Sequence, residues 1–149
     1  MTFEETTAAK IPIELLLQAD PSVENITSYI ENGLVFAAME RDLVVGVIVA
    51  GFLSDKKMEI YNVSVLEEFQ KRGVGSKLME FVLIRLKSKG VARIEVGTGA
   101  FGYPLTYYQR IGFRVDAILK DHFVNNYPET IYENGIQHKD MLRLYLNLE

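Results

Sequence analysis

The chain contains no cysteine among its 149 residues. This absence excludes disulfide bonds, thiolate metal sites and a cysteine nucleophile. Histidine is also scarce, because the chain has only His122 and His138. Neither histidine has a second ligand at a recognisable metal-binding spacing, so we expect no metal site.

An excess of positive charge and long apolar runs are absent as well. The formal net charge is −4, which argues against a nucleic-acid partner, because phosphate contacts need clustered lysine and arginine. No apolar run approaches the ~20 residues that span a bilayer. The start, MTFEETTAAKIPIELLL, carries acids where a signal peptide carries bases. We therefore expect a cytoplasmic protein with no membrane partner.

No repeat, low-complexity stretch or linker divides the chain, and its length fits one domain over 1–149. Apolar periodicity and turn residues then predict mixed strands and helices. The predicted strands are 9–20, a hairpin over 34–55, 56–66, 91–99, 112–121 and 141–148; the predicted helices are 20–33, 74–90 and 103–111. The first helix is predicted to have Asp20 as its N-cap. This order indicates an α/β (α+β) fold, with a mixed sheet and helices on both faces.

The stretch Gln70-Lys71-Arg72-Gly73-Val74-Gly75 stands directly before the longest predicted helix. The free N–H groups and positive dipole end of a helix N-terminus favour an anion, and glycines let a phosphate approach the backbone. A diphosphate is the natural ligand. The Walker and dinucleotide patterns both fail, the second because Leu78 stands where a third glycine is needed. From these residues alone, a tight turn without a ligand remains an equal alternative.

The same stretch resembles the Arg/Gln-x-x-Gly-x-Gly/Ala signature of the GNAT superfamily of N-acetyltransferases. A second stretch, Tyr108-Gln109-Arg110-Ile111-Gly112-Phe113, is similar to the family's Tyr-x-x-x-Gly-Phe. The resemblance implies the GNAT fold, a mixed and mostly antiparallel sheet of six to seven strands, splayed between strands 4 and 5. It also implies a small bacterial acyltransferase, which moves an acetyl group from acetyl-CoA to a primary amine of a small molecule by direct attack.

In the family, the backbone amides of this loop hold the pyrophosphate of coenzyme A, and the fourth strand pairs with its pantetheine arm. Carried over to this chain, the resemblance assigns acetyl-CoA binding to residues of the fourth strand, the loop, the fifth strand and the tyrosine helix. These residues are Val63, Val65, Gln70, Lys71, Arg72, Gly73, Val74, Gly75, Ser76, Thr98 and Tyr108. Many relatives carry an asparagine after the fifth strand, and in its absence Thr98 is the candidate substitute.

The chemistry needs a base and an acid. An aliphatic amine has a pKa near ~10.4 and must lose a proton before it attacks. Some family members carry their base on the fourth strand, where this chain has Glu59. Strand alternation predicts Glu59, Tyr61 and Val63 on one face and Asn62 on the other. The family places the tyrosine that protonates the leaving thiolate at Tyr108, and Tyr107 is expected in the core or the substrate wall.

The segment 121–140 is long for a connection. Its Tyr127, Glu129, Tyr132 and Glu133 could hold a cation by charge and ring faces, or form a surface hairpin that packs on its own tyrosines. The closing residues 129–146 also resemble a bacterial subgroup labelled indole-acetate acetyltransferase. Indoleacetic acid has no basic amine, so the acceptor stays open. An acyl-CoA-binding sensor without turnover and a peptide or protein N-terminal acetyltransferase are the alternatives, and relatives are often homodimers.

Overall fold

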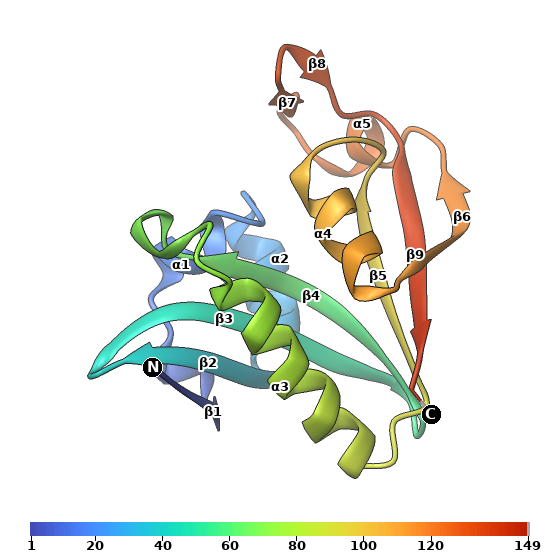
Figure 1. The fold of residues 1–149 in the computed structure, drawn as a ribbon. Coiled ribbons are helices and arrows are strands. Elements are labelled where there is room, and N and C mark those ends of the chain that lie inside the picture. The colour runs from blue at the N-terminus through green and yellow to red at the C-terminus, as the bar shows by residue number, and fades with distance from the viewer. Residues whose placement is uncertain (149) are drawn as a thin grey trace. The chain divides into compact units, whose positions relative to one another are not determined.

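The computed structural model describes residues 1–148, which form two compact units (Figure 1). Unit 1 contains residues 1–92 together with Leu148, and unit 2 contains residues 93–147. The description of 1–149 as a single domain stays a prediction. No helix within the described range is both long enough and apolar enough to cross a membrane.

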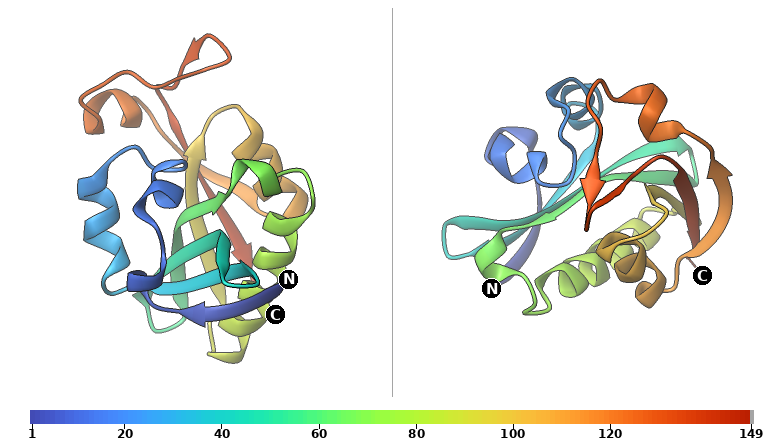
Figure 2. Two further views of the ribbon diagram at one scale, coloured as in Figure 1. Left: turned by 90° about the vertical axis from the view of Figure 1, so that its left-hand side faces the viewer. Right: turned by 90° about the horizontal axis from the view of Figure 1, so that it is seen from above.

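Unit 1 contains four antiparallel strands in the order β1-β2-β3-β4. The strands are β1 (Thr2–Thr6), β2 (Leu34–Glu40), β3 (Leu43–Ser54) and β4 (Lys57–Val65). The helices are η1 (Ala8–Lys10), α1 (Ile13–Leu17), α2 (Val23–Ile30), η2 (Glu67–Phe69) and α3 (Val74–Ser88). Helices α1 and α2 cover one face of these strands, and α3 covers the other (Figure 2).

Two apolar layers hold unit 1 together. On the α3 face, the helix buries Leu78, Met79, Val82 and Leu86 at helical spacing. On the other face, a buried cluster joins both short helices to the strands. Its members are Ile11, Leu15, Leu16, Ile26, Val35, Ala37, Val44, Val47 and Val49. Because strand residues alternate between faces, β2 and β3 supply both layers and are buried along most of their length.

The prediction for the N-terminal region was wrong. Residues 9–20 were expected to form the first strand, but they fold as η1 and α1, while the first strand is β1 at Thr2–Thr6. The apolar run at 15–17 fits one buried helical turn as well as a short strand, so periodicity could not separate the two. The N-cap of α2 is also two residues later than expected. Ser22 caps the helix by accepting from Asn25 N–H at 3.1 Å, and Asp20 instead accepts from Ser22 N–H.

A β-bulge at Tyr61 changes which residues of β4 share a face. Val49 pairs with Asn62 and Ala50 pairs with Ile60, so Tyr61 has no partner on β3. The ring of Tyr29 stacks on the ring of Tyr61, with centroids 5.0 Å apart. The Tyr29 hydroxyl accepts a hydrogen bond from Asn62 Nδ2 at 3.0 Å. Tyr61 and Asn62 therefore face α2 together. The simple alternation predicted for this strand was wrong beyond Tyr61.

Buried polar groups tie this bulge to the α1–α2 turn. Asn62 Nδ2 also donates to the Leu16 carbonyl at 2.9 Å, and Asn62 Oδ1 accepts from Ser64 Oγ at 2.7 Å. The Tyr29 hydroxyl in turn donates to Asp20 at 3.1 Å. Each buried polar side chain in this network therefore has a partner, as a folded interior requires.

Unit 2 contains three antiparallel strands in the order β5-β9-β6. Its elements are β5 (Arg93–Gly99), α4 (Tyr103–Ile111), β6 (Arg114–Leu119), α5 (His122–Asn126), β7 (Tyr132–Glu133), β8 (Ile136–Gln137) and β9 (Met141–Asn147). The leucines of β9 share one face as predicted, with Leu144 fully buried. Strands β7 and β8 form a separate small hairpin within the segment 121–140.

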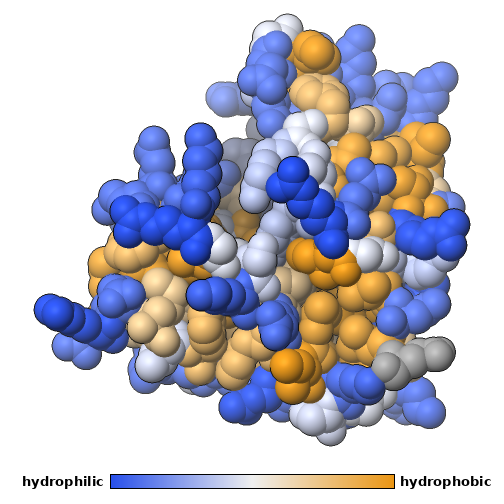
Figure 3. Space-filling model, in the orientation of Figure 1, coloured by the Kyte–Doolittle hydropathy of each residue, from blue (hydrophilic) through white to orange (hydrophobic). Residues whose placement is uncertain are grey.

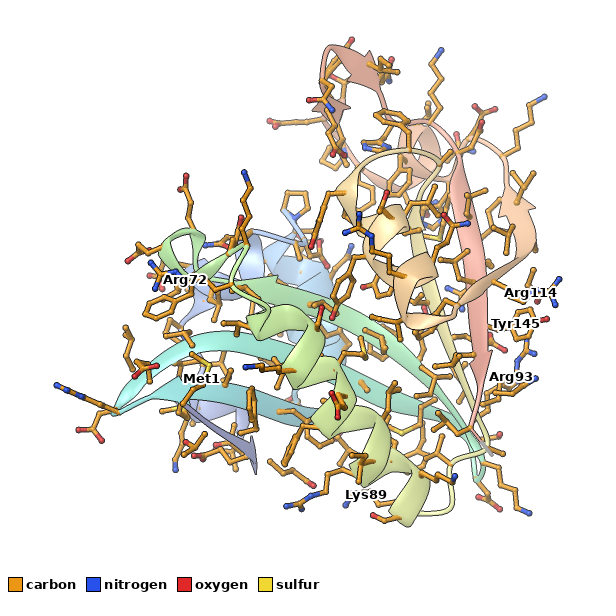
Figure 4. The ribbon with its side chains drawn as sticks, viewed as in Figure 1. Met1, Arg72, Lys89, Arg93, Arg114 and Tyr145 are labelled. Carbon is orange, nitrogen blue, oxygen red and sulfur yellow. The ribbon has the colours of Figure 1, made fainter. Side chains whose placement is uncertain are left out.

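The other face of this three-stranded unit carries charge. Arg93 reaches Glu95 at 2.9 Å and Asp116 at 3.3 Å, and it lies over the ring of Tyr145 at 4.3 Å (Figure 4). The predicted elements from 91 to 148 are confirmed to within about two residues at their ends. The predicted splay between the fourth and fifth strands concerns the junction of the two units and stays a prediction.

Candidate active site

The turn between β4 and α3 adopts a backbone that few residues tolerate. Lys71 has φ 62° and Gly73, the N-cap of α3, has φ 79°. Both values lie in the left-handed region, which glycine enters without steric cost and lysine does not. Residues 70–73 therefore curl tightly before the helix starts. Turns of this kind direct successive N–H groups toward one point, where an anion can bind.

The space beside Gly73 is open within the described part of the chain, because a Cβ added there would meet no heavy atom within 4 Å. None of the described side chains caps α3, and its first turn has no acidic residue, so the helix itself places no negative charge at the positive end of its dipole. The space, the uncapped helix and the left-handed turn together match the needs of an anionic group.

The side chains of Gln70, Lys71 and Arg72 are hydrophilic and exposed, and hydrophilic side chains gather on this part of unit 1 (Figure 3). Lys71 and Arg72 supply positive charge, and the guanidinium of Arg72 lies over the ring of Phe69 at 5.4 Å (Figure 4). Glu67 and Glu68 precede the turn in η2. The turn thus combines two cations with backbone donors, and its acids lie one turn earlier in the chain.

Gln70 has a structural role. Its Nε2 donates to the carbonyl of Val65 at 2.8 Å, which ties the turn to the end of β4. Val63 and Val65 are partly buried on β4, where they pair with Ile48 and Gly46 of β3. Val63, Val65 and the 70–76 stretch all lie in unit 1, and their assignment to acetyl-CoA binding stays a prediction.

Glu59 also lies on β4, opposite Gly51 of β3, and is partly buried. The ring of Tyr61 covers Gly51, because a Cβ at Gly51 would come within 2.7 Å of Tyr61 Cε2. Glu59 and Tyr61 consequently share the face that α1 and α2 cover. This placement makes Glu59 a residue of unit 1 on the same strand as Val63 and Val65.

The remaining predicted residues belong to unit 2. Thr98 is buried on β5, opposite Leu142 of β9. Tyr108 is buried on α4, with edge-to-face contacts to Tyr107 at 5.1 Å and to Phe113 at 5.5 Å. Among residues 1–148, no three His, Asp or Glu side chains gather as a metal site would require.

The environment of Tyr108 keeps its hydroxyl protonated. Burial raises the pKa of the Tyr108 phenol well above its ordinary value, because the phenolate would lose its hydration. The pKa of Tyr107 is raised by burial and, to a lesser extent, by the neighbouring Tyr108 and Tyr103. A neutral phenol at physiological pH is a proton donor, so Tyr108 has the protonation state that a general acid needs.

Comparison with known proteins agrees with this fold. The family described as the acetyltransferase (GNAT) domain matches residues 31–115. A curated Bacillus subtilis protein, the uncharacterized N-acetyltransferase YvbK, is 42% identical over 136 residues, which are 91% of this chain and 88% of that protein. The chain therefore belongs to the GNAT family of acetyltransferases.

Solved structures resemble this chain over nearly its whole length. The IAA acetyltransferase from Bacillus cereus has a TM-score of 0.92 and 40% identity, covering 99% of both chains. A GNAT family acetyltransferase from Elizabethkingia anophelis, solved with acetyl-CoA bound, has a TM-score of 0.92 and 38% identity, covering 99% of this chain and 97% of the other. The predicted GNAT fold is confirmed.

The raised pKa of Tyr108 predicts that its phenol does not ionise in an alkaline titration. Between pH 9 and 11 an ordinary phenol with a pKa near ~10 loses its proton, whereas Tyr108 stays neutral. The phenolate absorbance of the parent and of Tyr108→Phe should therefore rise by the same amount, with free tyrosine in the same buffer marking the ordinary range. A smaller rise in Tyr108→Phe would show that Tyr108 ionises there and would contradict the assignment.

Proposed function

We propose that the protein transfers the acetyl group of acetyl-CoA to a primary amine of a small molecule by direct attack of the amine. Membership of the GNAT family supports acetyl transfer, and the acetyl-CoA in the Elizabethkingia anophelis relative supports the donor. The observation that carries the proposal for this chain is the open, left-handed turn at Lys71 and Gly73 before an uncapped helix.

The turn fits the diphosphate of acetyl-CoA. Val74 and Ser76 lie in the first turn of α3, where backbone N–H groups have no carbonyl one turn earlier in the helix to bind. The phosphate oxygens would accept from these groups, with Lys71 and Arg72 adding charge. Gln70 holds the turn through Val65, so it contributes by fixing the backbone. The contacts of Val63, Val65 and Thr98 with the rest of the donor stay predictions.

The proposed reaction needs one base and one acid. Glu59 removes a proton from the incoming ammonium, directly or through water, and the neutral nitrogen then forms a bond to the thioester carbon. The carbon–sulfur bond breaks, and the Tyr108 hydroxyl gives its proton to the leaving sulfur. The second nitrogen proton restores the phenol, and the proton on Glu59 passes to solvent. The products are an amide, a thiol and one released proton.

The chemical class of the acceptor is limited by reactivity. The Bacillus cereus relative is named IAA acetyltransferase. Indoleacetic acid, however, offers only a ring nitrogen, which is a very poor nucleophile. We therefore expect a basic primary amine.

Thiol release should be measured across polyamines, aminoglycosides, amino acids and peptides. Acceleration by a small amine supports the proposal, acceleration by protein-terminus peptides alone supports the N-terminal alternative, and no acceleration supports a sensor.

The residue with the clearest kinetic prediction is Tyr108. Tyr108→Phe removes the acidic proton and keeps the ring, so kcat should fall about 100-fold while the affinity for acetyl-CoA stays within about twofold. The measurements are steady-state thiol release and calorimetric titration of acetyl-CoA. Tyr103→Phe, an exposed tyrosine on the same helix, is the matched control and should leave both values unchanged. Parent-like turnover in Tyr108→Phe would remove its role.

Glu59 has a separate test. Glu59→Gln preserves the shape of the side chain and removes the base, so kcat/KM for a basic amine should fall about 100-fold. An acceptor whose amine is already neutral at the assay pH should lose much less, because it no longer needs deprotonation. The control is Glu68→Gln, an exposed acid in η2. Equal losses for basic and neutral amines would exclude Glu59 as the base.

A further inference from the structure

His138 is a buried histidine that the proposed chemistry does not use. It follows β8, and its backbone N–H donates to the Ile131 carbonyl at 2.7 Å, which extends the β7–β8 hairpin. Its Nε2 lies 2.8 Å from Glu133 Oε1. Its side chain is only 9% exposed, and Nδ1 has no hydrogen-bond partner among residues 1–148. A buried histidine with an unpartnered ring nitrogen needs an explanation.

The unpartnered Nδ1 indicates which ring nitrogen of His138 carries the hydrogen. An N–H at Nδ1 would be a buried donor without an acceptor, which costs stability. The favoured arrangement therefore places the hydrogen on Nε2, which donates it to the Glu133 carboxylate. The hydrogen bond to His138 Nε2 orients the side chain of Glu133.

Residues 99–102, Gly-Ala-Phe-Gly, wrap around this pair from the end of β5 to the start of α4. The ring of Phe101 stacks on His138 with centroids 4.0 Å apart and planes within 6°. A Cβ at Gly99 would come within 2.5 Å of His138 Nδ1, and one at Gly102 within 2.5 Å of both Glu133 carboxylate oxygens. Both glycines are thus required by close approach, and the turn fits around the histidine and the carboxylate.

Gly102 is the N-cap of α4, with φ 105° and no side-chain cap of its own. The Glu133 carboxylate lies against this position, where negative charge is favoured by the helix dipole. Helix α4 carries Tyr108 six residues later. The hairpin, the His138–Glu133 pair and the turn therefore form a continuous set of contacts that ends at the helix of the proposed general acid.

We propose that His138 and Glu133 are positioning residues: they hold residues 99–102 and thereby fix the start of α4 and the place of Tyr108. In this proposal, the segment 121–140 holds helix α4 in place. The turnover part of this inference rests on the proposed function of Tyr108, whereas the structural part does not.

The activity-independent test is hydrogen exchange over residues 99–111. His138→Leu fills the space without the bond to Glu133, so exchange in this stretch should be faster than in the parent. His138→Gln places an amide N–H near the position of Nε2 and should restore slow exchange. His122→Leu, which changes the other histidine of the chain, is the control. Parent-like exchange in His138→Leu, or no rescue by glutamine, would overturn the positioning role.

The kinetic test separates positioning from general loss of structure. A misplaced Tyr108 should lower kcat about tenfold or more in His138→Leu and leave acetyl-CoA affinity unchanged. Glu133→Gln, which keeps an acceptor for Nε2 and loses the charge at α4, should show a smaller drop. In a Tyr108→Phe background the His138→Leu effect should vanish, because both changes act on one proton transfer. An undiminished effect in that background would contradict the proposal.

These outcomes distinguish the two levels of the proposal. If the parent shows no amine-dependent thiol release, the proposed function fails, and hydrogen exchange still decides whether His138 and Glu133 hold α4. If the parent turns over and exchange in His138→Leu is unchanged, the positioning inference fails alone. Should His138→Leu not fold, Gly99→Ala is the second variant, because its Cβ would press on the His138 ring. Exchange over residues 100–111 should then rise, and parent-like exchange would overturn the positioning role.

Discussion

The backbone geometry between β4 and α3 is the constraint on which the proposed chemistry depends. Two residues in the left-handed region, Lys71 and Gly73, turn the chain directly before α3, and a Cβ at Gly73 would meet no heavy atom of the described residues within 4 Å. Glycine satisfies this geometry at Gly73, and Gln70 anchors the turn to Val65. The helix itself is held by its buried apolar face, so its N-terminal end is fixed by packing along the whole of α3.

A second constraint acts on α4. Burial keeps the Tyr108 phenol neutral, and the contacts with Tyr107 and Phe113 hold the ring. The start of the same helix is shaped by Gly102 against Glu133. A general acid needs both the right protonation state and the right position. In the proposed chemistry, the core under α4 gives Tyr108 the first and the segment 121–140 gives it the second.

Much of this arrangement could be predicted from the sequence because it depends on local signals. The hairpin over 34–54, the long helix from Val74 and the alternating leucines of β9 all follow from periodicity and turn residues. The first strand was missed because residues 2–6, TFEET, are mostly polar and gain their place by pairing with β2. Residues 9–20 were misassigned because one apolar turn is too short for periodicity to decide.

The features that sequence could not supply are long-range. The bulge at Tyr61 arises from the pairing of β4 with β3, and the sequence of β4 alone does not indicate it. The contact between His138 and Glu133 was equally hidden, since its meaning depends on Gly99 and Gly102 from a distant part of the chain. The sequence marked the segment 121–140 as unusual by its length, and only tertiary contacts relate it to α4.

Calorimetric titration with acetyl-CoA of Gly73→Val beside Gly90→Val tests the anion-binding turn most directly. Both glycines flank α3 with positive φ, 79° and 87°, and neither has a heavy atom within 4 Å of a built Cβ. The two variants therefore carry similar backbone strain, but only the first places a side chain where the diphosphate is expected. Gly73→Val should weaken acetyl-CoA binding at least about tenfold, the value of one lost hydrogen bond to a charged group, and Gly90→Val should bind like the parent. Equal affinities in all three proteins, or no binding by the parent, would contradict the proposed site.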